Sequence, residues 1–167
     1  DMKGKKIRIP SGRVLQNLMT RYGANPVAMA TTEIATAFAQ GAIDIIYTSP
    51  GGWEMVGTMA KHATTVPGMQ IFTYAVVVHK HWLAVLSTAD LDSVLTADAM
   101  NKQWPGAMAE DIKALENMVG KGGISTRLNG KSVEEFEKLA AEVSADFRKK
   151  YPNVSANYDA LKAKLPN

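Results

Sequence analysis

The sequence contains no cysteine among its 167 residues. This absence excludes disulfide bonds, thiolate metal sites and catalytic cysteine nucleophiles. The sequence also lacks any run of about 18 consecutive apolar residues, the length that a membrane-spanning helix needs. Its longest apolar segment, residues 72–78, has the length of a β-strand.

The chain also lacks a strong excess of charge of either sign. It has 19 lysine and arginine residues and 16 aspartate and glutamate residues, giving a net charge of +3. The basic residues mostly alternate with acidic ones, so no basic surface for nucleic acid is apparent and no nucleic-acid partner is expected. An apolar fraction of 46% indicates a packed globular chain of one domain, or of one domain and part of another.

The first fifty residues alternate between the two kinds of secondary structure. Short apolar segments predict strands at residues 5–10, 26–30 and 43–47. Apolar residues at helical spacing predict a helix after each of the first two strands, and both helices end at glycine. The expected N-caps are Ser11 for the first helix and Thr31 or Thr32 for the second. This βαβαβ order predicts an α/β fold with a parallel sheet.

The rest of the chain is predicted to be mostly helical. A loop at Pro50-Gly51-Gly52 leads into a helix expected from Trp53 to His62. Residues 69–80 give the strongest strand signal, because the segment is long and rich in β-branched and aromatic residues. The later features are helices from 82 that are broken or kinked at Trp104-Pro105-Gly106, a strand at 124–128, a helix to 150 with a capping box at Ser132 and Glu135, and a last short helix. Residues 1–70 are therefore expected to form the ligand-binding unit, and residues 71–167 a crossover strand with C-terminal helices.

The sequence carries no recognisable catalytic or nucleotide-binding motif. It has no G-x-S-x-G, H-E-x-x-H, P-loop or G-x-G-x-x-G pattern. His79 and His81 would lie on the same side of a strand end and could form a metal pair, but no third ligand is near in sequence. A solvated strand end is the favoured interpretation. No catalytic residue, metal or cofactor is therefore expected.

Arg8 is unusual because it lies in the middle of an apolar strand. Burying a guanidinium is costly unless an acceptor pairs with it. One interpretation is an edge-strand arginine that faces solvent or pairs with Asp44 on a neighbouring strand. The other places Arg8 near the carboxyl end of a parallel strand, where α/β sheets bind ligands and where a guanidinium can bind a carboxylate in bidentate fashion.

Polar and aromatic residues follow the ends of the same three strands. Neutral hydrogen-bonding groups around one cation match a small monocarboxylate better than a phosphate. The candidate ligand-binding residues, besides Arg8, are Ser11, Thr31, Tyr47, Thr48, Ser49 and Trp53.

Four ordered motifs resemble one known family. They are K-G-K-K-I-R-I-P-S, G-A-N-P-V-A-M, T-E-I-A-T-A-F-A-Q-G-A-I-D and F-T-Y-A-V-V-V-H-K-H-W, which together extend from Lys3 to about Leu86. Their order and spacing resemble those of the dicarboxylate-binding (DctP-type) solute-binding proteins of TRAP (tripartite ATP-independent periplasmic) transporters. The chain departs from that pattern at Thr31, where the family has an aromatic residue, and at residues 45–48, so the resemblance implies an organic acid without naming it.

The resemblance implies a periplasmic, non-enzymatic protein with the fold of a periplasmic-binding-protein lobe. Such proteins close two lobes on a ligand and deliver it to a membrane permease. Arg8 would then bind the ligand carboxylate, and Ser11, Thr31 and Thr48 would occupy pocket positions. The chain resembles the C-terminal half of the family, so a homodimer or a domain swap is expected if the first lobe is absent. The alternatives are the ligand-sensing domain of a transcriptional regulator and an enzyme that uses His79 or His81.

Overall fold

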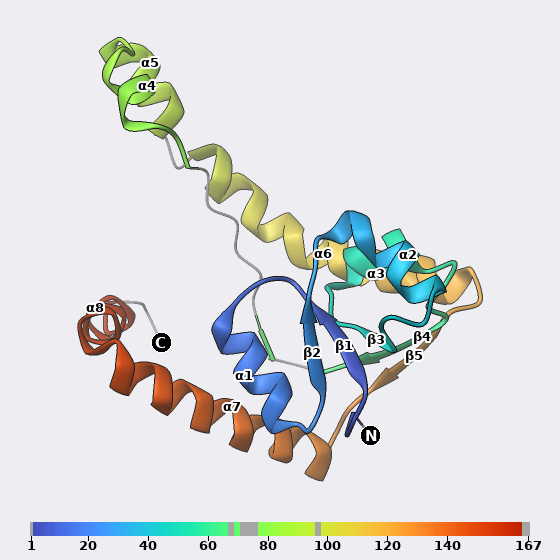
Figure 1. Ribbon diagram of the computed structural model, residues 1–167. Coiled ribbons are helices and arrows are strands. Elements are labelled where there is room, and N and C mark those ends of the chain that lie inside the picture. The colour runs from blue at the N-terminus through green and yellow to red at the C-terminus, as the bar shows by residue number, and fades with distance from the viewer. Residues whose placement is uncertain (1, 67–68, 71–76, 96–97, 165–167) are drawn as a thin grey trace.

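The computed structural model describes residues 2–66, 69–70, 77–95 and 98–164 (Figure 1). Helices surround short parallel strands. The elements in chain order are β1 (Lys6–Ile9), α1 (Arg13–Arg21), β2 (Asn25–Ala28), a 3-10 turn (Thr31–Glu33) that runs into α2 (Ile34–Ala39), β3 (Ile45–Ile46), α3 (Pro50–Val56), β4 (His62–Thr65), α4 (Lys80–Ala84), α5 (Thr88–Leu95), α6 (Asp98–Gly120), β5 (Ile124–Arg127), α7 (Lys131–Lys150) and α8 (Pro152–Lys162).

The first three strands form a parallel sheet in the order β2-β1-β3, which confirms the predicted βαβαβ unit. In the register, Arg8 lies opposite Val27 of β2 and Ile46 of β3. β1 is therefore the central strand, and Arg8 is not on an edge. Because the chain passes from β1 to one side and then to the other, the carboxyl end of β1 is the position where such sheets bind ligands.

The two faces of this sheet bury separate apolar clusters. Ile7 and Ile9 point to the face covered by α1 and α7, where they pack with Leu15, Leu18, Met19, Ala24 and Val143. The opposite face carries Ile34, Ile43, Trp53, Val56 and Met118, from α2, α3, α6 and the segment before β3. Val27 and Ile46 pack against this second cluster, and since side chains alternate along a strand, Arg8 shares their face.

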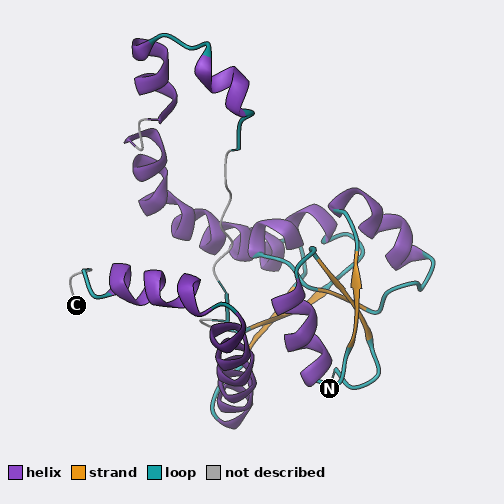
Figure 2. Ribbon diagram, turned by 60° about the vertical axis from the view of Figure 1, so that its left-hand side comes forward, coloured by secondary structure: helices purple, strands orange, loops and turns teal. Residues whose placement is uncertain are grey.

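A second parallel sheet joins β4 to β5, from His62 opposite Ile124 to Thr65 opposite Arg127 (Figure 2). The strand at 124–127 was predicted, but β4 was not. His62 was expected to end the helix that begins at Trp53. Instead α3 begins at Pro50, is capped by Ser49 and ends at Val56, since Gly57 and the turn after it stop the helix.

Three predicted N-caps and the break expected at Trp104-Pro105-Gly106 were wrong. Gly12, not Ser11, is the N-cap of α1, and Gly130, not Ser132, is the N-cap of α7; neither helix has a side-chain cap. The second helix is not capped by a threonine, because the carboxylate of Glu33 accepts the main-chain N–H of Ala30 at 2.9 Å and holds the 3-10 turn. α6 continues through the proline at 105, since a proline removes one hydrogen bond while the packing of α6 on α3 and β5 holds the helix.

The expected long strand at 69–80 lies partly outside the described residues. Residues 71–76 are not described, residues 77–79 are not in a strand, and Lys80 begins α4. α4 and α5 lie away from both sheets in Figures 1 and 2. No helix among the described residues is both long enough and apolar enough to cross a membrane.

The sequence predicted a division of the chain at residue 70. In the structure, contacts link residues before and after this point. β4 pairs with β5, α3 packs on α6, and α1 packs on α7. The last contact includes an ion pair between Arg21 and Glu142 at 2.8 Å and a hydrogen bond of 2.9 Å from the Tyr22 hydroxyl to the carbonyl of Phe136. The later helices thus support both faces of the first sheet, and the assignment of residues 1–70 to ligand binding stays a prediction.

Candidate functional site

Arg8 is buried at the carboxyl end of the sheet, with 5% of its surface exposed. Its Nε and Nη2 donate to the carbonyl oxygen of Met29, at 3.2 and 3.0 Å. Its Nη1 donates to the carbonyl oxygen of Tyr47 at 3.3 Å, and Nη2 also reaches Oγ1 of Thr31 at 3.4 Å. The guanidinium therefore connects the ends of all three strands.

All of these acceptors are neutral. Asp44, the one carboxylate considered as a partner, instead accepts the main-chain N–H of Lys6 at 2.8 Å. Within the described part of the chain, Arg8 forms no ion pair. Burial lowers the pKa of the Arg8 guanidinium, but arginine remains charged at neutral pH. The interpretation of Arg8 as a solvated or Asp44-paired arginine was wrong, and the site holds a buried cation without a counter-charge among these residues.

The contacts of the guanidinium differ in strength. The two bonds to Met29 are within the usual range for N–H···O distances, whereas those to Tyr47 and Thr31, at 3.3 and 3.4 Å, lie beyond it. A guanidinium has five N–H groups, and here one side of it is held firmly. The Nη1 and Nη2 hydrogens on the other side make only the two long contacts, so a stronger acceptor can replace these partners. Two adjacent N–H groups of this kind match the two oxygens of a carboxylate.

The other predicted residues are divided between the site and its surroundings. Thr31 and Tyr47 contact Arg8 as described. Ser49 is half-buried and accepts the N–H of Gly52 at 3.2 Å, so its hydroxyl caps α3. Thr48 is half-buried, and its Oγ1 lies so close to Gly52 that a side-chain carbon added there would be 1.8 Å away. Ser11 is exposed in the loop after β1.

Trp53 lies in the core rather than at the site. It is 4% exposed, and its indole N–H donates to the carbonyl of Ala60 at 2.6 Å. Its ring lies against Gly123, where an added Cβ would be 3.0 Å from it. The structure therefore places Trp53 between α3, α6 and β5, and it is not brought together with the other predicted residues.

Gln70 was not among the predicted site residues. The Tyr47 hydroxyl donates to Oε1 of Gln70 at 2.6 Å, which brings this exposed side chain to the end of β3. Gln70 was included in the long strand expected at 69–80 and had no motif of its own. Only the fold, which returns the chain to the end of β3 after β4, could identify it.

The two partly buried tyrosines near the first sheet should make the fold sensitive to alkali. Burial raises the pKa of Tyr47, and that of Tyr22, from 10.0 to about 12. An unfolded chain loses these protons near pH 10, while the folded chain keeps them, so ionisation favours unfolding between about pH 10 and pH 12. We expect the free energy of unfolding, measured by chemical denaturation at a series of pH values, to fall across this interval. Tyr47→Phe and Tyr22→Phe should each lessen the fall, and an equal fall in the double variant would contradict the prediction.

The two histidines considered as a metal pair stack on each other at the start of α4. Their ring centroids are 5.4 Å apart, and Nδ1 of His79 accepts the main-chain N–H of His81 at 3.3 Å. That nitrogen therefore caps α4. No group of three or more potential metal ligands occurs among the described residues.

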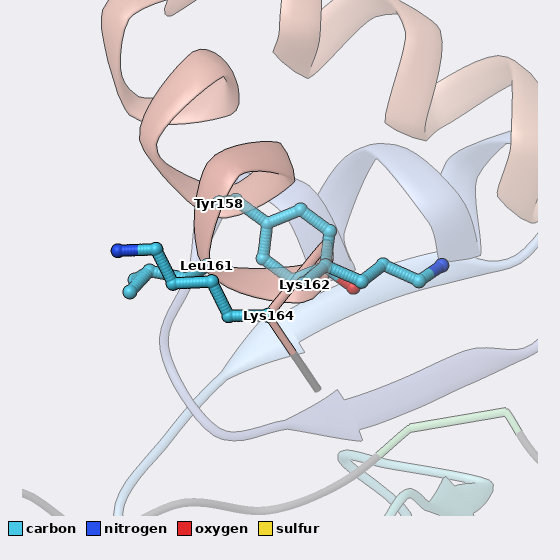
Figure 3. Close-up of a pocket in the computed structure, with 4 residues that line it drawn as sticks. All are labelled: Tyr158, Leu161, Lys162 and Lys164. Atoms are coloured by element: carbon cyan, nitrogen blue, oxygen red, sulfur yellow. The ribbon is translucent and has the colours of Figure 1, made fainter. Parts of the chain in front are cut away.

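Hollows elsewhere on the surface do not contain Arg8. One lies beside α2 and is lined by Ala28, Met29, Thr32, Glu33, Thr36, Ala37, Gln40 and Ala42. Another, of about 310 Å³, is formed on α8 by Tyr158, Leu161, Lys162 and Lys164 (Figure 3). In Figure 3 the two lysine ammonium groups lie on opposite sides of the Tyr158 ring.

The chain is similar in sequence to known proteins. Residues 1–150 match the family described as bacterial extracellular solute-binding protein, family 7. The chain belongs to this family. It is 30% identical over 149 residues to the C4-dicarboxylate-binding periplasmic protein DctP of Rhodobacter capsulatus, an alignment that covers 87% of this chain and 41% of that protein. The predicted family and the periplasmic localisation are thereby confirmed.

Solved structures of TRAP periplasmic solute-binding proteins share the fold. One from Pseudomonas putida F1 with bound D-glucuronate is 21% identical with a TM-score of 0.77, over 96% of this chain and 52% of that one. DctP7 of Bordetella pertussis, which binds pyroglutamic acid, is 23% identical with a TM-score of 0.76, over 90% and 50%. A third, from Desulfovibrio desulfuricans with bound sn-glycerol-3-phosphate, is 16% identical with a TM-score of 0.81, over 100% and 56%.

These comparisons confirm the predicted fold class and favour one of the functional predictions. The family and the structural neighbours are solute-binding proteins, not enzymes, which favours this prediction over a regulator domain or a histidine-dependent enzyme. The chain spans about half the length of the solved structures that it matches.

Proposed function

We propose that this chain is the ligand-binding lobe of an extracytoplasmic receptor that captures a small organic acid and delivers it to a TRAP membrane permease. The observation that carries the proposal is the buried guanidinium of Arg8, which has only neutral acceptors among the described residues. A buried cation without a counter-charge favours an anion strongly, because the anion offsets the cost of desolvation. The ligand carboxylate supplies that counter-charge.

The surroundings of Arg8 indicate the size and kind of acid. Among the described residues, Arg8 is bonded to hydroxyl and carbonyl groups and to no second charged side chain. A single carboxylate with neutral polar groups matches this arrangement better than two carboxylates do. D-glucuronate and pyroglutamic acid, the ligands of two structural neighbours, each have one carboxylate and further polar oxygens. Ser11 and Thr48 are proposed as additional contacts to the ligand when a second lobe closes over Arg8.

The exposed apolar side chains of the later helices are proposed to pack against another lobe. Exposed apolar side chains lie before α4, on it, at its C-cap and on α6: Val77, Trp82, Val85, Met108 and Ile112. Relatives about twice as long have further chain that could cover such a surface. A homodimer or a domain swap is the alternative, and sedimentation at several protein concentrations distinguishes it by an increase in mass with concentration.

Calorimetric titration of the intact protein tests the function. D-glucuronate and pyroglutamate are compared with D-glucose and 2-pyrrolidone, which lack the carboxylate. At least one acid should bind, and its uncharged counterpart should bind at least about 100-fold more weakly, because it lacks charge-assisted hydrogen bonds. Equal affinities for an acid and its uncharged counterpart, or no binding of any acid, would overturn the proposal.

A further inference from the structure

Tyr47 connects two polar groups at the carboxyl end of the sheet. Its carbonyl oxygen accepts from Nη1 of Arg8 at 3.3 Å, and its hydroxyl donates to Oε1 of Gln70 at 2.6 Å. Arg8 and Gln70 are 62 positions apart in sequence but lie on either side of one residue. Both side chains therefore lie at the carboxyl end of the sheet, Arg8 from the face of Val27 and Ile46 and Gln70 from the opposite face, where the Tyr47 side chain packs.

The hydrogen bond from Tyr47 determines how Gln70 can act. It occupies the amide oxygen and leaves the amide NH₂ group, which donates to no other group in the described part of the chain. The Gln70 side chain is exposed, so its NH₂ group is accessible to a ligand. The Tyr47 phenol is protonated at neutral pH, as tyrosines ordinarily are, so it remains a donor and maintains the orientation of the amide.

We infer that Gln70 is a specificity-determining residue whose amide N–H groups bind an oxygen of the ligand remote from its carboxylate, and that Tyr47 positions this amide. The inference rests on the proposed function, because it takes the carboxylate to be held by Arg8. It extends that function to a substrate class. The preferred acids carry a hydrogen-bond-accepting hydroxyl, lactam or carbonyl oxygen, and acids with a purely hydrocarbon body are disfavoured because the amide then loses its hydration without a replacement partner.

A matched pair of acids distinguishes the contact of Arg8 with the carboxylate from the contact of Gln70 with the remote oxygen. Pyroglutamate and cyclopentanecarboxylate have the same ring size and the same carboxylate, but only pyroglutamate has a lactam oxygen. Gln70→Met keeps the length of the side chain and removes its N–H donors, whereas Tyr47→Phe removes the hydroxyl that positions Gln70. Binding of both acids is measured by calorimetry on the intact protein and its variants, with circular dichroism to show that each variant is folded.

The intact protein should bind pyroglutamate about tenfold more tightly than cyclopentanecarboxylate, the effect of one hydrogen bond. Gln70→Met should abolish this preference by weakening pyroglutamate alone, and Tyr47→Phe should reduce it. Arg8→Ala should weaken both acids alike. A preference that is absent in the intact protein or unchanged in Gln70→Met, while Arg8→Ala weakens both acids, would overturn the inference and leave the function intact. An unchanged affinity for both acids in Arg8→Ala, or no binding of either acid, would overturn both.

Discussion

Arg8→Ala should weaken the binding of a carboxylate ligand by at least about 100-fold, because it removes two charge-assisted hydrogen bonds. The same change removes the hydrogen bonds that Arg8 donates to the carbonyl oxygens of Met29 and Tyr47. A loss of about 1–3 kcal/mol in the free energy of unfolding is therefore expected as well. Calorimetry measures the first effect and chemical denaturation the second. Both are measured at a temperature well below the unfolding midpoint of the variant, so that loss of binding reflects the site.

Two further variants show which property of Arg8 matters. Arg8→Lys keeps the positive charge but lacks the planar fork that can hold Met29 and a carboxylate together, so its affinity should fall by about tenfold or more. Arg13→Ala removes an exposed arginine at the start of α1 and changes the net charge as Arg8→Ala does. It should leave affinity unchanged. Equal losses in Arg8→Ala and Arg13→Ala would show that overall charge, and not a clamp at Arg8, attracts the ligand.

Trp53→Ala should lower the free energy of unfolding by about 3–5 kcal/mol, the usual effect of truncating a buried aromatic side chain. Trp53 is 4% exposed and packs with Val56 and Met118 in the cluster that joins α3 to α6. Truncation also leaves the carbonyl of Ala60 without the indole N–H that it accepts at 2.6 Å. The measurement is chemical denaturation monitored by circular dichroism, since two other tryptophans complicate fluorescence.

Trp53→Phe is the second variant in case the alanine variant does not fold. It keeps an aromatic ring and removes the N–H, so a smaller loss, of about 1–3 kcal/mol, is expected. Met55→Ala is the matched control on the same helix, because Met55 is 73% exposed and its truncation should have little effect. Folded Trp53→Phe protein should bind ligand as the original does. A loss of ligand affinity without a loss of stability would contradict the assignment of Trp53 to the core and indicate that it contacts the ligand.

The parallel sheet could be predicted because its strands are short apolar segments that alternate with helices ended by glycine. Gly23 and Gly41 have positive φ values of 78° and 68°, the conformation that glycine adopts readily at helix ends. β4 could not be predicted in the same way. Its sequence, His62–Thr65, is short and polar, and it is a strand because β5 supplies its hydrogen-bond partners from 62 residues further along the chain.

Arg8 could be identified from sequence because burying a cation in an apolar strand costs free energy unless an acceptor or an anion pairs with it. Thr31 and Tyr47 followed from the rule that parallel strands end at one edge, and both contact Arg8. Trp53 was misplaced because a residue just inside a helix can face the site or the core, and the spacing alone does not distinguish them. Gln70 was missed because its position depends on a tertiary contact with Tyr47, for which the sequence has no local signal.

The bonds from Arg8 to Met29 have a consequence for the entropy of binding. A long arginine side chain on a free surface samples many rotamers, and fixing such a side chain on binding costs about 0.5–1.5 kcal/mol. In this protein, two bonds of 3.2 and 3.0 Å to one carbonyl already hold the guanidinium before any ligand arrives. The entropy cost of ordering the Arg8 side chain is therefore incurred during folding. An anion then binds a guanidinium that Met29 already holds in place.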